Sequence, residues 1–146
     1  MRVLVTGSRS WKDTDAVHTA LDALAQSAAQ VGYDGIAIVH GGAKGADTSA
    51  GLWASDRKRR GWPVTAEVHP AGWRQYGPAA GMRRNREMVQ LGADACLAFL
   101  NICESDRCRR PRPHHTHGAS GCADLAEAAD IHTVRITPRP DSPGGA

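Results

Sequence analysis

The chain has 146 residues, of which 41% are hydrophobic, 23% charged and 5% aromatic, and its formal net charge is +3. This length and apolar content suit one domain with a single core, so we expect no second domain. The small positive charge fits an anionic small ligand, and the shortage of aromatic residues argues against nucleic acid as a partner. The apolar start of the chain breaks at Gly7, too early for a signal peptide or a membrane span. We therefore expect a cytoplasmic protein with no membrane partner.

Short aliphatic or β-branched runs alternate along the chain with segments whose apolar residues recur at helical spacing. The runs predict strands, and the periodic segments predict helices. The predicted strands are 2–6, 36–39, 64–68, 95–100 and 133–136. The predicted helices run from 13 or 14 to about 32, from 46 to about 61, from about 79 to 91, and from 122 to about 129. This alternation indicates an α/β fold, a Rossmann-like open parallel sheet of about five strands with helices on both faces.

One Rossmann-like domain is expected over residues 1–137. Within it, residues 101–118 carry cysteine, histidine and proline but little apolar periodicity, which predicts an inserted loop. Residues 138–146 are rich in proline, glycine and serine, which predicts a disordered tail. Ligands of such sheets bind beyond the carboxyl ends of the strands. The polar loops at 6–11, 40–47, 69–73 and 117–122 all follow strands, so we expect them to share that edge.

The sequence HGGAKGAD at residues 40–47 joins the second predicted strand to the next helix. Glycines let a backbone approach a ligand closely, and the free N–H groups at a helix start favour anions. Lys44 would add a full positive charge. The loop lacks the Gly-Lys-Ser/Thr ending of a Walker A motif, so it is not an ATPase signature. We interpret it as a phosphate-accepting loop, and a tight structural turn is the alternative.

Two clusters of basic side chains stand out. The run at 57–60 closes a predicted helix, where cations compensate the helix dipole, so we interpret it as a solvated helix end rather than a nucleic-acid patch. Arg83, Arg84 and Arg86 lie near the start of the helix at 79–91, where acidic residues are preferred. Such a cationic start suits a bound anion, and the alternative is arginines spread over the surface.

Five segments carry a family resemblance: VTGSR-x-W at 5–11, HGGAKGAD at 40–47, PA-x-W at 70–73, RN-x-x-MV at 84–89 and GAD at 92–94. Their order and spacing resemble the YspA/YpsA-like branch of the SLOG superfamily over most of residues 1–136. The resemblance implies a Rossmann-like fold that binds nucleotides or nucleotide-derived molecules, and it implies a homodimer.

The ligand-binding residues that we predict come from the loops after the strands. The HGGAKGAD loop, with Lys44, Arg9 and Arg84, would hold a phosphate, and Trp11 or Trp73 would stack a base. The full predicted set is Gly7, Ser8, Arg9, Trp11, Gly41, Gly42, Lys44, Gly45, Asp47, Trp73, Arg84, Asn85, Ser120 and Gly121.

The superfamily also contains the Lonely-guy phosphoribohydrolases and the DNA-processing protein DprA. Residues 84–88 are similar to the Arg-Lys-x-x-Met segment of the Lonely-guy enzymes, and residues 118–125 take the place of their Pro-Gly-Gly-x-Gly-Thr-x-x-Glu segment. Leu125 stands at the glutamate position, where a carboxylate would stabilise the charge that builds on the ribose. We therefore expect a nucleotide-binding protein or sensor, and a phosphoribohydrolase is the alternative. In that enzyme Arg84 and Asp124, or Asp47, would be catalytic. Single-stranded DNA binding, as in DprA, is a further alternative.

The inserted loop contains a candidate structural zinc site. Cys103 and Cys108 offer thiolates, and His114 and His117 offer imidazoles, in a segment with few apolar residues to hold it in place. Cys122 is a further candidate that could replace one histidine. Such a site would have four protein residues on the zinc ion. Binding of the nucleotide at the sheet edge beyond the strands would require no cofactor. A mobile loop with uncommitted thiols is the alternative.

Overall fold

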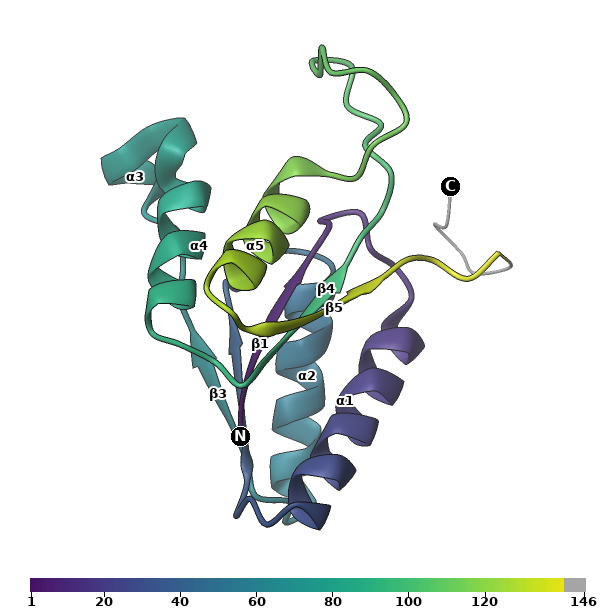
Figure 1. The fold of residues 1–146 in the computed structure, drawn as a ribbon, viewed down its shortest axis with the longest axis vertical. Helices are drawn as coiled ribbons and strands as arrows, with labels where there is room; N and C mark the ends of the chain where they lie inside the picture. The colour runs from purple at the N-terminus through teal and green to yellow at the C-terminus, as the bar shows by residue number, and fades with distance from the viewer. Residues whose placement is uncertain (141–146) are drawn as a thin grey trace.

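The computed structural model describes residues 1–140 and centres on a five-stranded parallel sheet in the order β3-β2-β1-β4-β5 (Figure 1). The strands are β1 Arg2–Gly7, β2 Ile36–His40, β3 Val64–Val68, β4 Ala95–Phe99 and β5 His132–Ile136. Every predicted strand is confirmed to within one residue at either end. The predicted Rossmann-like parallel sheet is therefore confirmed. The prediction succeeded because short aliphatic runs buried on both faces are typical of central parallel strands.

Helices cover both faces of the sheet (Figure 1). Helices α1 Thr14–Gln30 and α2 Ala46–Arg59 pack together on one face, and α4 Ala80–Gln90 and α5 His117–Ala128 pack together on the other. The carboxylate of Asp13 caps α1 by accepting a hydrogen bond from the N–H of Ala16 at 3.0 Å. This cap satisfies a backbone donor that the first helical turn would otherwise leave open.

Alternate residues of the central strand build a half-core on each side. Val3 and Val5 of β1 point toward α1 and α2, where they join Trp53 in a fully buried cluster. Leu4 points to the opposite face and joins Met88 of α4 and other buried side chains of α5. The two-residue period of a strand thus divides one short run between two apolar layers.

Two segments differ from their prediction. Helix α5 begins at His117 rather than at Cys122, so the turn predicted around Gly118 to Gly121 is instead the first turn of the helix. Its buried residues are Ala119, Cys122, Ala123 and Ala126, a helical spacing that outweighs the two glycines. The segment expected to be a loop before α4 contains a short helix, α3 Trp73–Tyr76, and one 3₁₀ turn, η1 Gly77–Ala79.

Near the end of the described chain, Arg139 donates a hydrogen bond to Asp13 at 2.8 Å. Residues 141–146 of the tail predicted at 138–146 lie outside the described residues. None of the helices within residues 1–140 has the length and apolarity needed to cross a membrane.

Candidate functional site

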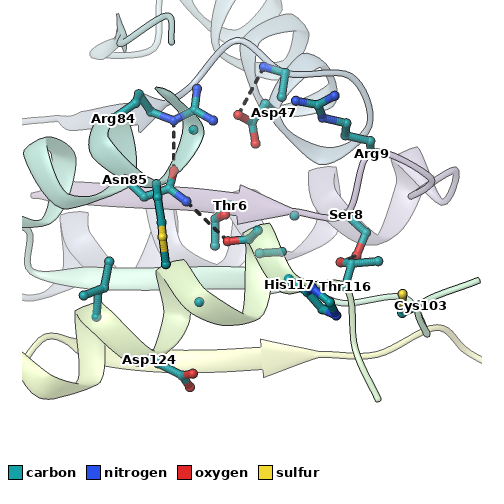
Figure 2. A pocket seen from close by; sticks show the side chains of 18 of the residues that line it. Thr6, Ser8, Arg9, Asp47, Arg84, Asn85, Cys103, Thr116, His117 and Asp124 are labelled. Atoms are coloured by element: carbon teal, nitrogen blue, oxygen red, sulfur yellow. Dashed lines mark hydrogen bonds between the residues drawn. The ribbon is translucent and has the colours of Figure 1, made fainter. Parts of the chain in front are cut away.

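A cleft of about 980 Å³ opens at the carboxyl edge of the sheet. Its walls are the loops after β1 and β4, the start of α5 and one side of α4 (Figure 2). Strands β1 and β4 are neighbours at the point where the strand order reverses, because the chain runs outward from β1 through β2 to β3 and then returns to β4. Ligands of open α/β sheets bind at this switch in strand order. The cleft therefore lies where the topology alone would place a binding site.

Ser8 ties three of these walls together. Its hydroxyl accepts a hydrogen bond from the backbone N–H of Asn101 at 2.9 Å and shares another with the hydroxyl of Thr116 at 2.5 Å. The Asn101 amide in turn donates to the hydroxyl of Ser10 at 2.9 Å. Asn101 and Thr116 were not predicted as site residues. The one sequence signal that could have indicated Asn101 is that it is a polar residue directly after a strand. This network fixes the loops after β1 and β4 against the start of α5.

The HGGAKGAD loop is organised around Asp47. One oxygen of its carboxylate accepts hydrogen bonds from Gly41 N at 2.9 Å and Ala43 N at 3.3 Å, while the Nδ1 atom of His40 accepts from Gly42 N at 3.0 Å. Three amides that could have faced a phosphate are thus already bonded inside the loop. Burial raises the pKa of Asp47, and the two backbone hydrogen bonds and the nearby arginines oppose that rise.

Arg84 connects the glycine loop to the rest of the site. Its Nη1 donates to the carbonyl of Gly41 at 2.8 Å and to that of His69 at 3.3 Å, and its Nε donates to Asn85 at 2.9 Å. The Asn85 amide then donates to the carbonyl of Gly118 at 3.3 Å (Figure 2). A Cβ atom at Gly41 would collide with the guanidinium, which explains the glycine there. Arg84 lies in the second turn of α4 rather than the first, and it lines the cleft.

The two tryptophans that were predicted to stack a base occupy different environments. Trp11 is 4% exposed, its ring lies 5.3 Å from that of Phe99, and its indole N–H donates to the carbonyl of Asp13. Stacking by Trp11 is therefore ruled out by its burial in the core. Trp73 is 49% exposed on the rim of the cleft, with the Arg9 guanidinium 5.5 Å from its ring centre.

The other predicted ligand-binding residues divide into two groups. Those that line the cleft are Gly7, Ser8, Arg9, Asp47, Trp73, Arg84, Asn85 and Gly121. Those that do not line the cleft are Trp11, Gly41, Gly42, Lys44, Gly45 and Ser120, although several of them are chain neighbours of lining residues. Lys44 is exposed, and the Ser120 hydroxyl donates back to the carbonyl of Thr116 at 2.9 Å. The cleft also has an apolar wall from α4 and α5 that sequence reasoning missed, and it includes Met82, Met88, Leu125 and Ala128.

Comparison with known proteins agrees with this architecture. Residues 1–76 match the profile of the YAcAr family, described as the YspA, cpYpsA-related SLOG family. The chain belongs to this family. It is also 51% identical, over 98 residues, to the Gene 61 protein of Mycobacterium phage D29, an alignment that covers 67% of this chain and 75% of that protein. The resemblance inferred from the motifs is therefore confirmed, and the profile includes the loops after β1 and β2.

Asp124, which a phosphoribohydrolase of the SLOG superfamily could use in place of the glutamate, lines the cleft but is paired with Arg135. Its side chain is 72% exposed and lies 2.6 Å from the Arg135 guanidinium on β5. Figure 2 shows it at the opposite side of the cleft from Arg84. Arg135 also pairs with Glu127 of α5 at 3.0 Å, so the carboxylate belongs to an ion-pair network between α5 and β5.

The inserted loop, which lies outside the matched residues of the family, contains a cluster that could hold a metal such as zinc. The potential ligand atoms of Cys103, Cys108, His114 and His117 all lie within 4.8 Å of one another. Cys122, the alternative ligand, is fully buried on the sheet side of α5 beside Cys96. Burial raises the pKa of Cys122 to about 11 and that of Cys96 to about 12, so both are inert core thiols. The cluster of potential ligand atoms does not include Cys122, so the alternative assignment of Cys122 to the metal site is wrong.

Proposed function

We propose that the chain binds a nucleotide or nucleotide-derived ligand in this cleft, as a binding or sensor protein. The proposal rests on two kinds of side chain that line the cleft together. Arg9 and Arg84 supply positive charge, and Met82, Met88 and Leu125 supply an apolar surface. A nucleotide needs both, because its phosphate is anionic and its base is flat and weakly polar. Binding pockets commonly combine an apolar lining with a few placed polar groups in this way.

In this proposal the phosphate lies between Arg84 and the first turn of α5. Gly118 and Ala119 line the cleft, and the N–H groups of a first helical turn have no partner within the helix. Asn85 holds the start of α5 close to Arg84 through its hydrogen bond to Gly118. The amides of the HGGAKGAD loop are a weaker candidate, because Asp47 and His40 already accept hydrogen bonds from three of them.

A phosphoribohydrolase, the enzymatic alternative, would need a carboxylate that faces the ribose. Asp124 is paired with Arg135, and one oxygen of Asp47 is bonded to two backbone amides. Both carboxylates line the cleft, but these contacts already engage one oxygen of each, so we favour binding without hydrolysis. Incubation with nucleoside monophosphates, followed by chromatography for free base, tests this directly, and release of base at a rate proportional to protein concentration would establish the enzyme instead.

Thermal unfolding with a panel of nucleoside mono-, di- and triphosphates and the matching nucleosides tests the binding proposal. A ligand at about a hundred times its Kd stabilises the folded protein by about 2.7 kcal/mol, which raises the Tm by several degrees in a domain of this size. We expect stabilisation by at least one phosphorylated compound and weaker stabilisation by its nucleoside. A Tm that stays constant across the panel at millimolar concentrations would contradict the proposal.

Three substitutions distinguish the possible phosphate positions. Arg84→Ala removes the guanidinium that this proposal places beside the phosphate, and we expect it to weaken binding of the stabilising nucleotide by about 1–3 kcal/mol. Lys12→Ala, which removes an exposed cation after β1, should leave binding unchanged. Lys44→Ala should also have little effect, and a loss as large as that of Arg84→Ala would move the phosphate to the HGGAKGAD loop.

The homodimer implied by the family resemblance also remains a proposal. The apolar face of α1 does not support it, because Val17 and Leu21 are fully buried against the sheet. Exposed apolar side chains such as Leu52 and Met82, each 61% exposed, are better candidates for an interface. Light scattering that reports about 15.5 kDa over a wide concentration range would reject the dimer.

A further inference from the structure

We propose that Cys103, Cys108, His114 and His117 bind a structural zinc ion that fixes the loop after β4 as one wall of the cleft. Occupancy of this site is independent of the proposed nucleotide ligand. Only its effect on ligand affinity rests on the proposed function.

The backbone of the loop places the four residues together. Its two arms pair in an antiparallel bridge between Ile102 and His115, and Cys103 N donates to the carbonyl of His114 at 2.8 Å. This pairing puts the first cysteine beside the first histidine although they are far apart in sequence. His117, at the first position of α5, follows directly from the second arm.

The distances among the side chains approach those of a tetrahedral site. The Cys108 sulfur lies 3.4 Å from Nε2 of His114 and 3.4 Å from Nε2 of His117, and the two nitrogens are 2.9 Å apart. With Zn–S near 2.3 Å and Zn–N near 2.0–2.1 Å, a tetrahedral ion would separate a sulfur from a nitrogen by about 3.6 Å and two nitrogens by about 3.3 Å. Movements of a few tenths of an ångström therefore suffice at these three residues, and Cys103 completes the set within 4.8 Å.

The hydrogen bond of His114 prepares its ring for a metal. Its Nδ1 atom lies 2.8 Å from the carbonyl oxygen of Pro111, an acceptor, so Nδ1 carries the proton. The lone pair is then on Nε2, the atom that faces Cys108 and His117. A backbone carbonyl that fixes the tautomer in this way is the usual second partner of a metal-binding histidine.

The loop needs such a ligand because it has little else to hold it in place. In the described chain, no residue from 104 to 118 is buried, whereas Cys103 is only 5% exposed. The Arg112 guanidinium donates to the carbonyls of Cys103 and Ser105, which orders the base of the loop but buries no apolar surface. Small segments that lack a core commonly depend on a metal or disulfides for their structure.

The donor set favours zinc in a structural role. Two thiolates and two imidazoles in tetrahedral arrangement suit Zn²⁺, and four protein ligands leave no open position for a substrate. Cys103, Thr116 and His117 also line the cleft (Figure 2). A zinc ion here would therefore hold the wall opposite Arg84 without taking part in any reaction.

The test is elemental analysis of the full chain, expressed in zinc-supplemented medium and purified without a histidine tag or chelator. We expect about one zinc per chain, and a zinc content at least tenfold lower in Cys108→Ser and in His114→Gln. His115→Gln, a change in the adjacent histidine outside the cluster, is the matched control and should retain zinc. Cobalt in place of zinc should show the intense visible bands of tetrahedral Co²⁺ with thiolate ligands.

Thiol reactivity gives a second measurement on the same samples. Cys96, Cys103 and Cys122 are buried, so the half-buried Cys108 is the thiol that reports on the site. It should be protected in the zinc-loaded protein and react after chelation. Less than about a tenth of an equivalent of zinc, together with a freely reacting Cys108 in the native protein, would overturn the proposal. Iron in place of zinc would overturn the assignment of the metal.

The effect on the cleft is measured by comparing zinc-loaded and chelated protein with a nucleotide that stabilises the fold. We expect at least a fivefold loss of affinity on chelation, restored by adding zinc back, and no loss when chelator is added to Cys108→Ser. Unchanged affinity after complete removal of zinc would separate the loop from the cleft and overturn that part of the proposal. Zinc content stays interpretable even if no nucleotide binds.

Discussion

Replacing Asp47 by alanine tests whether the HGGAKGAD loop is held by its own carboxylate. Asp47 is 4% exposed and accepts one hydrogen bond of normal length, from Gly41 N at 2.9 Å, and one long one, from Ala43 N at 3.3 Å. Leaving a buried donor unsatisfied costs about 1–3 kcal/mol. Removing a buried carboxylate recovers part of its desolvation penalty, so we expect Asp47→Ala to lower the free energy of unfolding by about 2–4 kcal/mol.

Urea denaturation at pH 7 measures this change, with Asp124→Ala as the control. Asp124 is 72% exposed in its ion pair with Arg135, so its loss should change stability by less than about 1 kcal/mol. If the stability of Asp47→Ala lay within about 0.5 kcal/mol of the parent, the scale of ordinary surface substitutions, the carboxylate would not be what holds the loop.

The raised pKa of Asp47 adds a dependence on pH. Its folded-state pKa lies above the unfolded value, so the unfolded chain releases the proton first as pH rises. The contribution of this group to stability is therefore full below the unfolded pKa near 3.8 and is lost as pH rises through the folded pKa. The isosteric variant Asp47→Asn should lack this decline. Above about pH 4, the ordinary pKa of an aspartate, the unfolding free energies of parent and Asp47→Asn should depend differently on pH. An identical dependence would argue against a raised pKa at Asp47.

Three further substitutions probe other contacts. Asp22→Asn should cost about 1–2 kcal/mol at pH 7 and less near pH 3. The hydrogen bond from Arg57 lowers the pKa of this carboxyl, so its contribution is full above the unfolded value of 3.8 and is lost as pH falls through the lower folded pKa. Equal losses at both pH values in urea titrations would contradict this. Ser8→Ala should cost about 1–3 kcal/mol, since the buried N–H of Asn101 loses its acceptor, and a Tm equal to that of the parent would count against that role. In Gly41→Ala the new methyl group should displace the Arg84 guanidinium and lower the free energy of unfolding by about 1–2 kcal/mol. An unchanged stability in the same denaturation assay would show that the loop adapts.

The sequence was sufficient to predict the sheet because each strand is a short aliphatic run followed by a polar turn. Residues 36–40, for example, are buried at four of five positions and pair with strands on both sides, as a continuous apolar run indicates. The cysteine and histidine cluster was also predictable, because metal-binding residue types are rare enough for their proximity in sequence to be informative.

The interior of the cleft was harder to predict, because hydrogen-bond partners depend on three-dimensional contacts. Nothing in the local sequence shows that the Asp47 carboxylate turns back onto the loop amides, or that Arg84 reaches the carbonyl of Gly41. Trp11 and Trp73 look alike in sequence, yet one packs on Phe99 in the core and the other lies on the rim. The start of α5 was missed because its two glycines resemble a turn, while the apolar spacing that specifies the helix consists mainly of small alanines.

An NMR titration of ¹⁵N-labelled protein with the most stabilising nucleoside monophosphate locates the bound phosphate. We expect saturable shifts at the amides of Gly118 and Ala119 and in the loop after β1, with smaller shifts for the nucleoside. Shifts confined to the amides of Gly42 and Lys44, or none in the cleft at saturation, would contradict this expectation.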